Sequence, residues 1–328
     1  MDQDFPDSRE VIRQAFLKKG APGLATDAML ASLSDSTVAQ YTKPLRLWWQ
    51  FSKEKGINFF SPSVSSVLDF LASCISHAGS YSTLNTYRSA ISLISSNEVG
   101  QHPLIKRFFK GIAVLKPQKP RYEFVWDPFP VIEYLASLFS YESLSLELIS
   151  KKLITLLALT TAQRMQTLAS IQCSNIAISD TIVIRIPARL KTSGIGRPQP
   201  LLTFKPFSDR PELCVFSLVN IYLELTRELR QDNCDSFFIS YRKPYKSVSA
   251  QTLGRWVKTM LEAAGIDISI FSAHSTRHAA TSLAASKGLN VEEIRRTAGW
   301  SKVSSVFARF YNKPIVRDAS FQAAILST

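Results

Sequence analysis

Apolar residues recur at intervals of three and four along most of the first 116 residues, and no run there alternates as a β-strand does. This spacing puts the apolar side chains on one face of a helix, so it predicts amphipathic helices. We therefore expect residues 1–20 to form an N-terminal arm helix and residues 21–116 a small helical bundle. Five helices are expected, each opened by Ser, Asp or Pro, near 8–19, 36–55, 63–75, 82–94 and 103–114.

A short basic run at 116–121 contains two prolines. Proline stops helices and stiffens the backbone, so residues 117–127 are the expected linker. The 328-residue chain is also longer than a single core usually spans, which favours two domains. The second domain, 128–328, is predicted to be helical with one small β-hairpin, because β-branched residues fill 181–186 and an apolar run follows at 201–204. The fold class is thus mainly α with a small β-sheet.

Lysine and arginine number 39 against 26 acidic residues, a formal net charge of +13. Six basic residues and no acid lie in 101–121, and eight with only Asp180 lie in 151–205. A solvated face normally mixes both signs, so these stretches favour a surface that faces phosphates. Nucleic acid is the expected partner, ahead of an anionic membrane. The candidate DNA-binding residues are Lys106, Arg107, Lys110, Lys116, Lys119, Arg121, Arg189 and Arg197.

Several classes of protein are excluded by what the sequence lacks. No apolar run approaches the ~20 residues that cross a bilayer. The start, MDQDFPDSRE, is acidic and unlike a signal peptide, so we expect a soluble, intracellular protein. The four cysteines are scattered without a CxxC pair and are expected to be buried free thiols. The four histidines form no HExxH, and no metal site or cofactor is predicted.

The most informative stretch is 273–280, AHSTRHAA. His274, Arg277 and His278 stand at positions i, i+3 and i+4, so on a helix they share one face. A Gly-Trp pair follows, and Trp300 lies 26 positions after His274.

Three further residues complete the pattern. Tyr311 lies 11 positions after Trp300, Arg164 follows an upstream apolar helix, and Lys191 lies near the tip of the predicted hairpin. From about 25 to 315 the chain resembles the tyrosine recombinase family, and its tail GWSKVSSVFARFYNKP is most similar to integrases of eukaryotic Crypton and DIRS/Ngaro-type mobile elements. The resemblance implies a helical core-binding domain and a C-terminal mixed α/β catalytic domain that clamp DNA together.

The resemblance implies six catalytic residues, Arg164, Lys191, His274, Arg277, Trp300 and Tyr311. Two planar, permanently charged guanidiniums suit a scissile phosphate without a metal ion. Tyr311 would attack it and form a 3′-phosphotyrosyl link that preserves the bond energy for rejoining. Lys191 would protonate the leaving 5′ oxygen, and His274 would move the tyrosine proton or bond a non-bridging oxygen. Trp300 could donate only its indole N–H.

Two positions depart from the family pattern. Tyr311 lies 11 positions after Trp300, whereas in many family members the tyrosine lies about nine positions after the corresponding residue. This difference affects which position along the last helix the nucleophile occupies. Thr167 stands where members often carry an acid, three residues after Arg164, and this predicts a weaker hydrogen-bonded support. His278 is interpreted as structural.

The expected partner is double-stranded DNA at element ends and target sites. We expect a monomer or weak dimer in the free state and a homo-tetramer on two synapsed duplexes, with no membrane contact. The apolar stripes at 11–16 and 321–326 either pack on their own domain or contact a neighbouring copy. A eukaryotic element would place the protein in the nucleus. Alternatives are a type IB topoisomerase-like enzyme, which uses the same residues, and a domesticated, non-catalytic DNA-binding protein.

Overall fold

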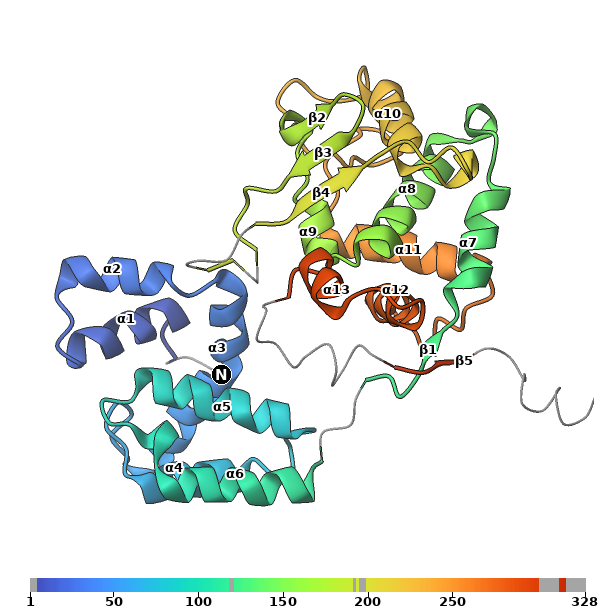
Figure 1. Cartoon of the computed structure of the whole chain (residues 1–328). Helices are drawn as coiled ribbons and strands as arrows, with labels where there is room; N and C mark the ends of the chain where they lie inside the picture. The colour runs from blue at the N-terminus through green and yellow to red at the C-terminus, as the bar shows by residue number, and fades with distance from the viewer. Residues whose placement is uncertain (1–4, 118–120, 191–192, 195–198, 301–312, 317–328) are drawn as a thin grey trace, which may run out of the picture. The chain divides into compact units, whose positions relative to one another are not determined.

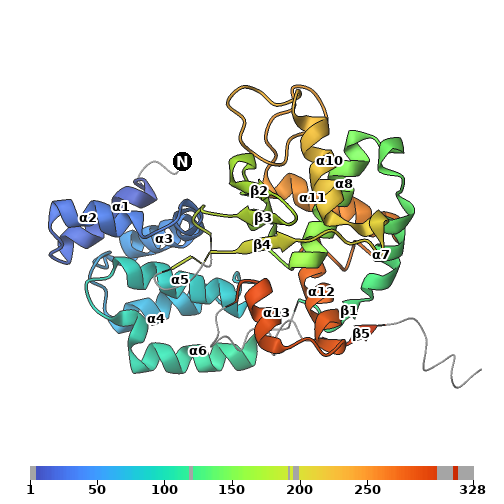
Figure 2. The ribbon, with the colours of Figure 1, turned by 45° about the horizontal axis from the view of Figure 1, so that its top comes forward.

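The chain divides into two compact units, the first unit of residues 1–120 and the second unit of residues 121–328. Figures 1 and 2 show their helices and strands from two directions. The computed structural model describes residues 5–117, 121–190, 193–194, 199–300 and 313–316.

In the described residues of the first unit, the regular secondary structure is helical, as predicted. Side-chain oxygens of Asp7, Ser34, Ser63 and Ser80 accept backbone N–H groups at the starts of four helices, which is the capping expected of these residue types. The elements are α1 Ser8–Lys18, α2 Gly23–Ala31, α3 Asp35–Lys55, α4 Val64–Ser73, α5 Tyr81–Ile94, the 3₁₀ turn η1 Val99–Gln101 and α6 Pro103–Leu115.

The expected N-terminal arm helix is part of the core of the first unit. In α1 the apolar stripe Val11, Ile12, Ala15 and Phe16 is buried, and the helix packs against α2, α3 and α5. The stripe therefore docks within its own unit. Helix α2 was not predicted, because its sequence GLATDAMLA has no amphipathic stripe and buries only Thr26 and Leu30.

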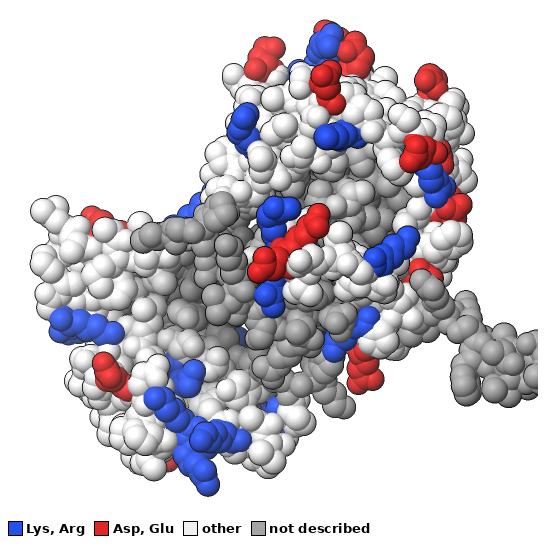
Figure 3. Space-filling model, viewed as in Figure 1, with Lys and Arg blue, Asp and Glu red and all other residues white. Residues whose placement is uncertain are grey.

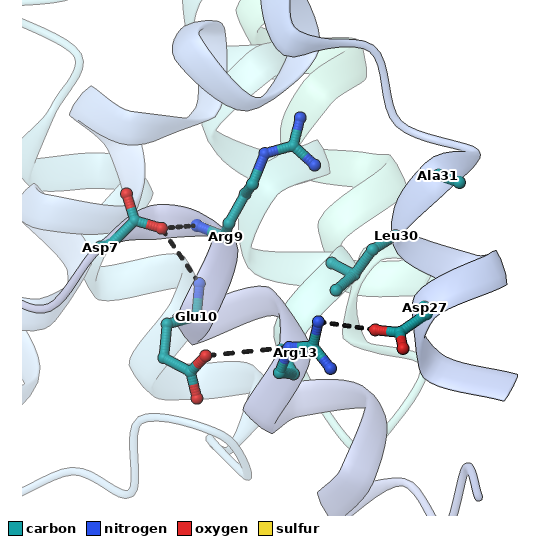
Figure 4. A pocket seen from close by; sticks show the side chains of 7 residues that line it. All are labelled: Asp7, Arg9, Glu10, Arg13, Asp27, Leu30 and Ala31. Atoms are coloured by element: carbon teal, nitrogen blue, oxygen red, sulfur yellow. Dashed lines mark hydrogen bonds and ion pairs between the residues drawn. The ribbon is translucent and has the colours of Figure 1, made fainter. Parts of the chain in front are cut away.

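A pocket lies between α1 and α2, and charged side chains line it (Figure 4). The Arg13 guanidinium lies 2.6 Å from an Asp27 carboxylate oxygen and 3.8 Å from one of Glu10. The Asp7 carboxylate accepts the backbone N–H groups of Arg9 and Glu10 at 2.8 and 3.2 Å. The ion pair of Arg13 with Asp27 joins α1 to α2, whereas Arg9 pairs with Asp35 of α3.

The second unit is mixed α/β and builds its core around α8. Helix α8 packs against α10, α11 and α12 and buries most of its length. The elements are β1 Val125–Trp126, α7 Pro128–Ser137, η2 Tyr141–Ser143, α8 Leu146–Thr161, α9 Met165–Ala169, η3 Cys173–Asn175, β2 Ile176–Ile178, β3 Ile182–Arg185, β4 Leu201–Phe204, η4 Pro211–Leu213, α10 Val215–Thr226, α11 Ala250–Ala263, α12 Ser275–Ser286, α13 Val291–Thr297 and β5 Ile315–Val316.

The predicted hairpin is confirmed in β3 and β4, which pair antiparallel with Ile184 opposite Leu202. Strand β2 adds a third strand, with Ile176 opposite Ile184 (Figure 2). The sequence did not predict β2, because three residues give too short an alternation to distinguish from a loop. The sheet presents Ile182, Ile184 and Leu202 to the core.

Residues 121–127, expected in the linker, belong to the second unit. Tyr122, Val125 and Trp126 are buried, and β1 pairs in parallel with β5, with Val125 opposite Ile315. Burial of these apolar side chains outweighs the linker character that the preceding prolines suggest. The segment after the prolines therefore packs in the second unit and pairs with β5 near the C-terminal end of the chain.

Charge counting along 151–205 was misleading at one position. Lys152 is 0% exposed, its Nζ donates to the Leu138 carbonyl at 2.6 Å, and it lies over the Tyr141 ring at 4.7 Å. Burial lowers the pKa of Lys152 to about 8, against the opposing charge of Glu212. Lys152 therefore cannot face a phosphate, and its role lies in the core.

All four cysteines are free thiols, as predicted. Two of them, Cys74 and Cys214, are buried, whereas Cys173 and Cys234 are only half-buried. Within the described part of the chain, no helix is long and apolar enough to span a bilayer.

Candidate active site

Arg164 stands in a sharp turn between two helices. Helix α8 ends at Thr161, and its C-cap residue Ala162 adopts a left-handed conformation with φ 48°. Gln163 follows and is 4% exposed, and the half-buried Arg164 is the N-cap residue of α9. The turn thus places a guanidinium at the edge of the core directly after a helix end. Thr167, in place of the family's acid, is buried in α9.

His274 begins the helix that carries the motif. It precedes α12 as the N-cap residue, with helical dihedral angles, and it is half-buried. Its ring centroid lies 5.4 Å from that of His278, which in turn lies 5.2 Å from Tyr122 in an edge-to-face contact. The buried His278 therefore lies in contact with both rings and holds the helix against the β1 segment, in agreement with a structural role.

Strand β1 also ties down the start of α12. The Trp126 indole N–H donates to the Ser275 hydroxyl at 2.8 Å, and that hydroxyl donates to the Ser272 carbonyl at 2.7 Å. The Tyr122 and Ser272 hydroxyls lie 2.8 Å apart. Tyr122 and Trp126, at the start of the second unit, thereby fix the backbone on both sides of His274.

The Gly-Trp pair forms the end of α13. Gly299 has φ +68°, its N–H donates to the Arg296 carbonyl at 3.1 Å, and the Trp300 N–H donates to the Arg295 carbonyl at 2.8 Å. These two bonds are the Schellman motif, which needs a left-handed residue that glycine supplies at least cost. The Trp300 side chain packs against Ile294 of the same helix. The Gly-Trp pair therefore has a structural role, since it ends α13, in addition to the chemical role expected of Trp300.

Arg277 joins these turns. Its side chain is 1% exposed, its Nη1 donates to the Ala162 carbonyl at 2.7 Å, and its Nη2 donates to the Ala298 carbonyl at 2.7 Å. The Trp300 ring lies over the guanidinium at 4.5 Å, a cation–π contact. One buried charge thus connects the turn before Arg164, the motif helix and the turn that ends α13.

Four of the six expected catalytic residues lie in the described part of the chain, namely Arg164, His274, Arg277 and Trp300. Arg277 and Trp300 are in contact, and Arg164 lies two residues after the carbonyl that Arg277 binds. Lys191 and Tyr311 lie outside the described residues. Within the described residues, no group of three or more His, Cys, Asp and Glu side chains lies in a geometry that could hold a metal ion.

Gln163 is the residue of this site that sequence reasoning missed. Its Nε2 donates to the Thr297 carbonyl at 2.6 Å, across 134 residues of chain. Its position next to Arg164 was visible in the sequence. Nothing in the sequence indicated that it binds α13, because the two turns meet only in the folded unit.

The expected DNA-binding residues differ in their surroundings. Lys106, Arg107 and Lys110 are exposed on α6, and Figure 3 shows basic side chains gathered on the first unit where α4 and α6 run. Lys116 instead donates its Nζ to the Ala78 carbonyl at 2.6 Å. In the second unit Arg121 and Arg189 are exposed. Lys119 and Arg197 lie outside the described residues.

Residues 135–315 match the sequence profile of the phage integrase family. The chain belongs to this family. It is a tyrosine recombinase, an enzyme that cleaves and rejoins DNA, and the resemblance read from its motifs is confirmed at the level of the family. A comparison with curated proteins finds no match.

Solved structures of recombinases share the fold of this family member. A XerH recombinase bound to a palindromic difH substrate has a TM-score of 0.59 and 16% identity, covering 92% of this chain and 81% of that one. A Tn1549 transposon integrase in complex with transposon right end DNA has a TM-score of 0.58 and 12% identity, and the match covers 98% of this chain and 98% of that one. A lambda integrase dimer bound to a COC′ core site has a TM-score of 0.53 and 14% identity, and the match covers 87% of this chain and 74% of that one.

Proposed function

We propose that this tyrosine recombinase moves a mobile DNA element by cutting and rejoining DNA through Tyr311 at the site around Arg277. The proposal is supported chiefly by one observation: Arg277 connects the turn that carries Arg164 with the turn that carries Trp300. The two turns that Arg277 connects thus carry a further guanidinium, that of Arg164, and the indole N–H of Trp300, both of them hydrogen-bond donors suited to a phosphodiester. The mobile-element role is supported by the fold shared with a Tn1549 transposon integrase solved in complex with transposon right end DNA. If the element is eukaryotic, the protein has to enter the nucleus.

In the proposed reaction the Tyr311 oxygen attacks the scissile phosphorus and loses its proton. The bond from phosphorus to the 5′ oxygen breaks, and that oxygen takes a proton from Lys191. His274 holds a non-bridging oxygen or receives the phenol proton, while Arg164 and Trp300 bind the phosphate oxygens. The product is a 3′-phosphotyrosyl link, which a 5′ hydroxyl reverses when strands are rejoined.

The nucleophile is tested by Tyr311→Phe on duplexes that carry the DNA flanking the element. A nick beside the cleavage position lets the leaving strand diffuse away, so that the parental protein accumulates as a covalent adduct. We expect the Phe variant to form no adduct and to bind the duplex within about twofold of the parental affinity, because only the phenolic oxygen is lost. EDTA should leave the parental rate unchanged. An adduct formed by Tyr311→Phe would move the nucleophile elsewhere.

We further propose that four copies act on two synapsed duplexes, since one solved relative is a lambda integrase tetramer bound to a Holliday junction. Residues 315–316 pair with β1 of their own unit, so a tail that reaches a neighbour would start beyond them. Removal of 318–328 should spare binding and adduct formation on one duplex but abolish the joining of two. Full recombination by the shortened chain would assign the tail to its own domain.

A further inference from the structure

The end of α13 is held by two side chains from elsewhere in the unit. The Gly299 and Trp300 N–H groups satisfy carbonyls one turn back, so the next carbonyls, those of Thr297 and Ala298, need donors from outside the helix. Arg277 supplies one donor to Ala298 at 2.7 Å, and Gln163 supplies the other to Thr297 at 2.6 Å. The two donors act on neighbouring carbonyls, but only Gln163 comes from the Arg164 turn.

Gln163 is placed to relate two reactive side chains. It directly precedes Arg164, and the carbonyl that it binds lies three residues before Trp300. The turn also packs on its amide: a Cβ added to Gly299 would lie 3.6 Å from Gln163 Oε1 and 3.7 Å from Nε2. With the side chain 4% exposed, water has little access to this contact. This direct hydrogen bond, together with the two that Arg277 donates, therefore sets the separation between the Arg164 backbone and the Trp300 turn.

We propose that Gln163 is a positioning residue for strand cleavage, holding Trp300 in register with Arg164 so that both reach the same phosphate. The inference rests on the proposed function, in which Arg164 and Trp300 bind the scissile phosphate. Gln163 itself touches no reacting atom. Its effect belongs to the cleavage step, because misplacement of a donor by about 1 Å can cost on the order of a hundredfold in rate.

The first test replaces the amide while keeping the length of the side chain. Gln163→Met should leave DNA affinity within about twofold and lower the single-turnover rate of adduct formation at least about tenfold. Gln166→Met makes the same change at an exposed position of α9 and should leave the rate unchanged. Should Gln163→Met fold poorly, Gln163→Glu keeps the same heavy-atom shape but replaces the donor with an acceptor, and should show the same loss of rate without loss of affinity.

The second test asks whether Gln163 acts through Trp300. Trp300→Phe removes the indole N–H, and the double variant with Gln163→Met should cleave no more slowly than the slower single variant, because both remove one shared interaction. Independent, multiplicative losses would overturn the positioning role, as would an unchanged rate in Gln163→Met. Failure of the parental protein to form any adduct would instead overturn the proposed function.

Discussion

The Arg277 guanidinium is almost completely buried, and its Nη1 and Nη2 donate to two backbone carbonyl oxygens. A buried charge is tolerated only where hydrogen bonds replace its hydration. Two backbone carbonyls and the face of Trp300 serve that purpose here. A lysine could not bind both carbonyls in this geometry, because its ammonium is a single point whereas the guanidinium is a planar fork. The residue therefore assembles the site as well as contributing its charge to it.

Lys152 gives a pH-dependent prediction at the scale of one residue. Its pKa is about 8 in the folded chain and 10.5 in the unfolded one, so between these values the unfolded state binds the extra proton. Stability should rise with pH across that window, whereas below pH 8 the cost of the buried charge is fully present. The free energy of unfolding of the parental chain, measured against Lys152→Met by urea titration, should gain about 2–3 kcal/mol from pH 8 to 10.5. A constant difference would show that Lys152 is not desolvated.

At the scale of elements, the ends of the motif helices were readable because they depend on local chemistry. Asn290 caps α13 by accepting the Glu292 N–H at 2.8 Å, and Gly288 and Gly299 adopt the positive φ values that follow helix ends. The pairing of β1 with β5 was not readable, since two-residue strands 190 positions apart leave no periodic signal.

The candidate site likewise combines features that local sequence indicates with features that depend on distant contacts. The resemblance to the recombinase motif proposed His274, Arg277 and Trp300 as site residues, on the basis of their order and spacing in the sequence. It gave no hint that Arg277 would be enclosed or that Gln163 would bind Thr297, because both contacts depend on how distant turns pack. The sequence motif thus names the candidate residues, and tertiary packing decides how they are held.

The end of α13 offers an element-scale prediction. Gly299→Ala puts a Cβ on a residue with φ +68°, which costs roughly 1–2 kcal/mol, although its nearest contact of 3.6 Å is an ordinary one. The free energy of unfolding should fall by that amount. Gly111→Ala is the matched control, because Gly111 lies within α6 with open space around it. There the same change should stabilise the chain by about 0.5–1 kcal/mol. Equal effects at both sites would refute the role of the left-handed turn.

At the scale of the whole molecule, the net charge of +13 is not evenly available to a polyanion. Lys152 is buried, Lys116 is bound to a carbonyl, and Arg13 is paired with Asp27 at 2.6 Å. The exposed residues of α6 have no acidic neighbour along their helix. The exposure of a basic side chain and the groups that it already binds therefore decide whether it contributes to DNA binding.

Salt dependence of DNA affinity distinguishes these groups of charges. Each phosphate neutralised contributes about −0.9 to the slope of log K against log salt, so joint replacement of Lys106, Arg107 and Lys110 by alanine should reduce the slope by up to about 2.7. The control replaces Arg9 and Arg13, which form ion pairs with Asp35 and Asp27, and should leave the slope nearly unchanged. Binding to one duplex is measured between about 50 and 200 mM salt. Equal reductions per charge in both variants would mean that net charge alone, and not the α6 surface, attracts the DNA.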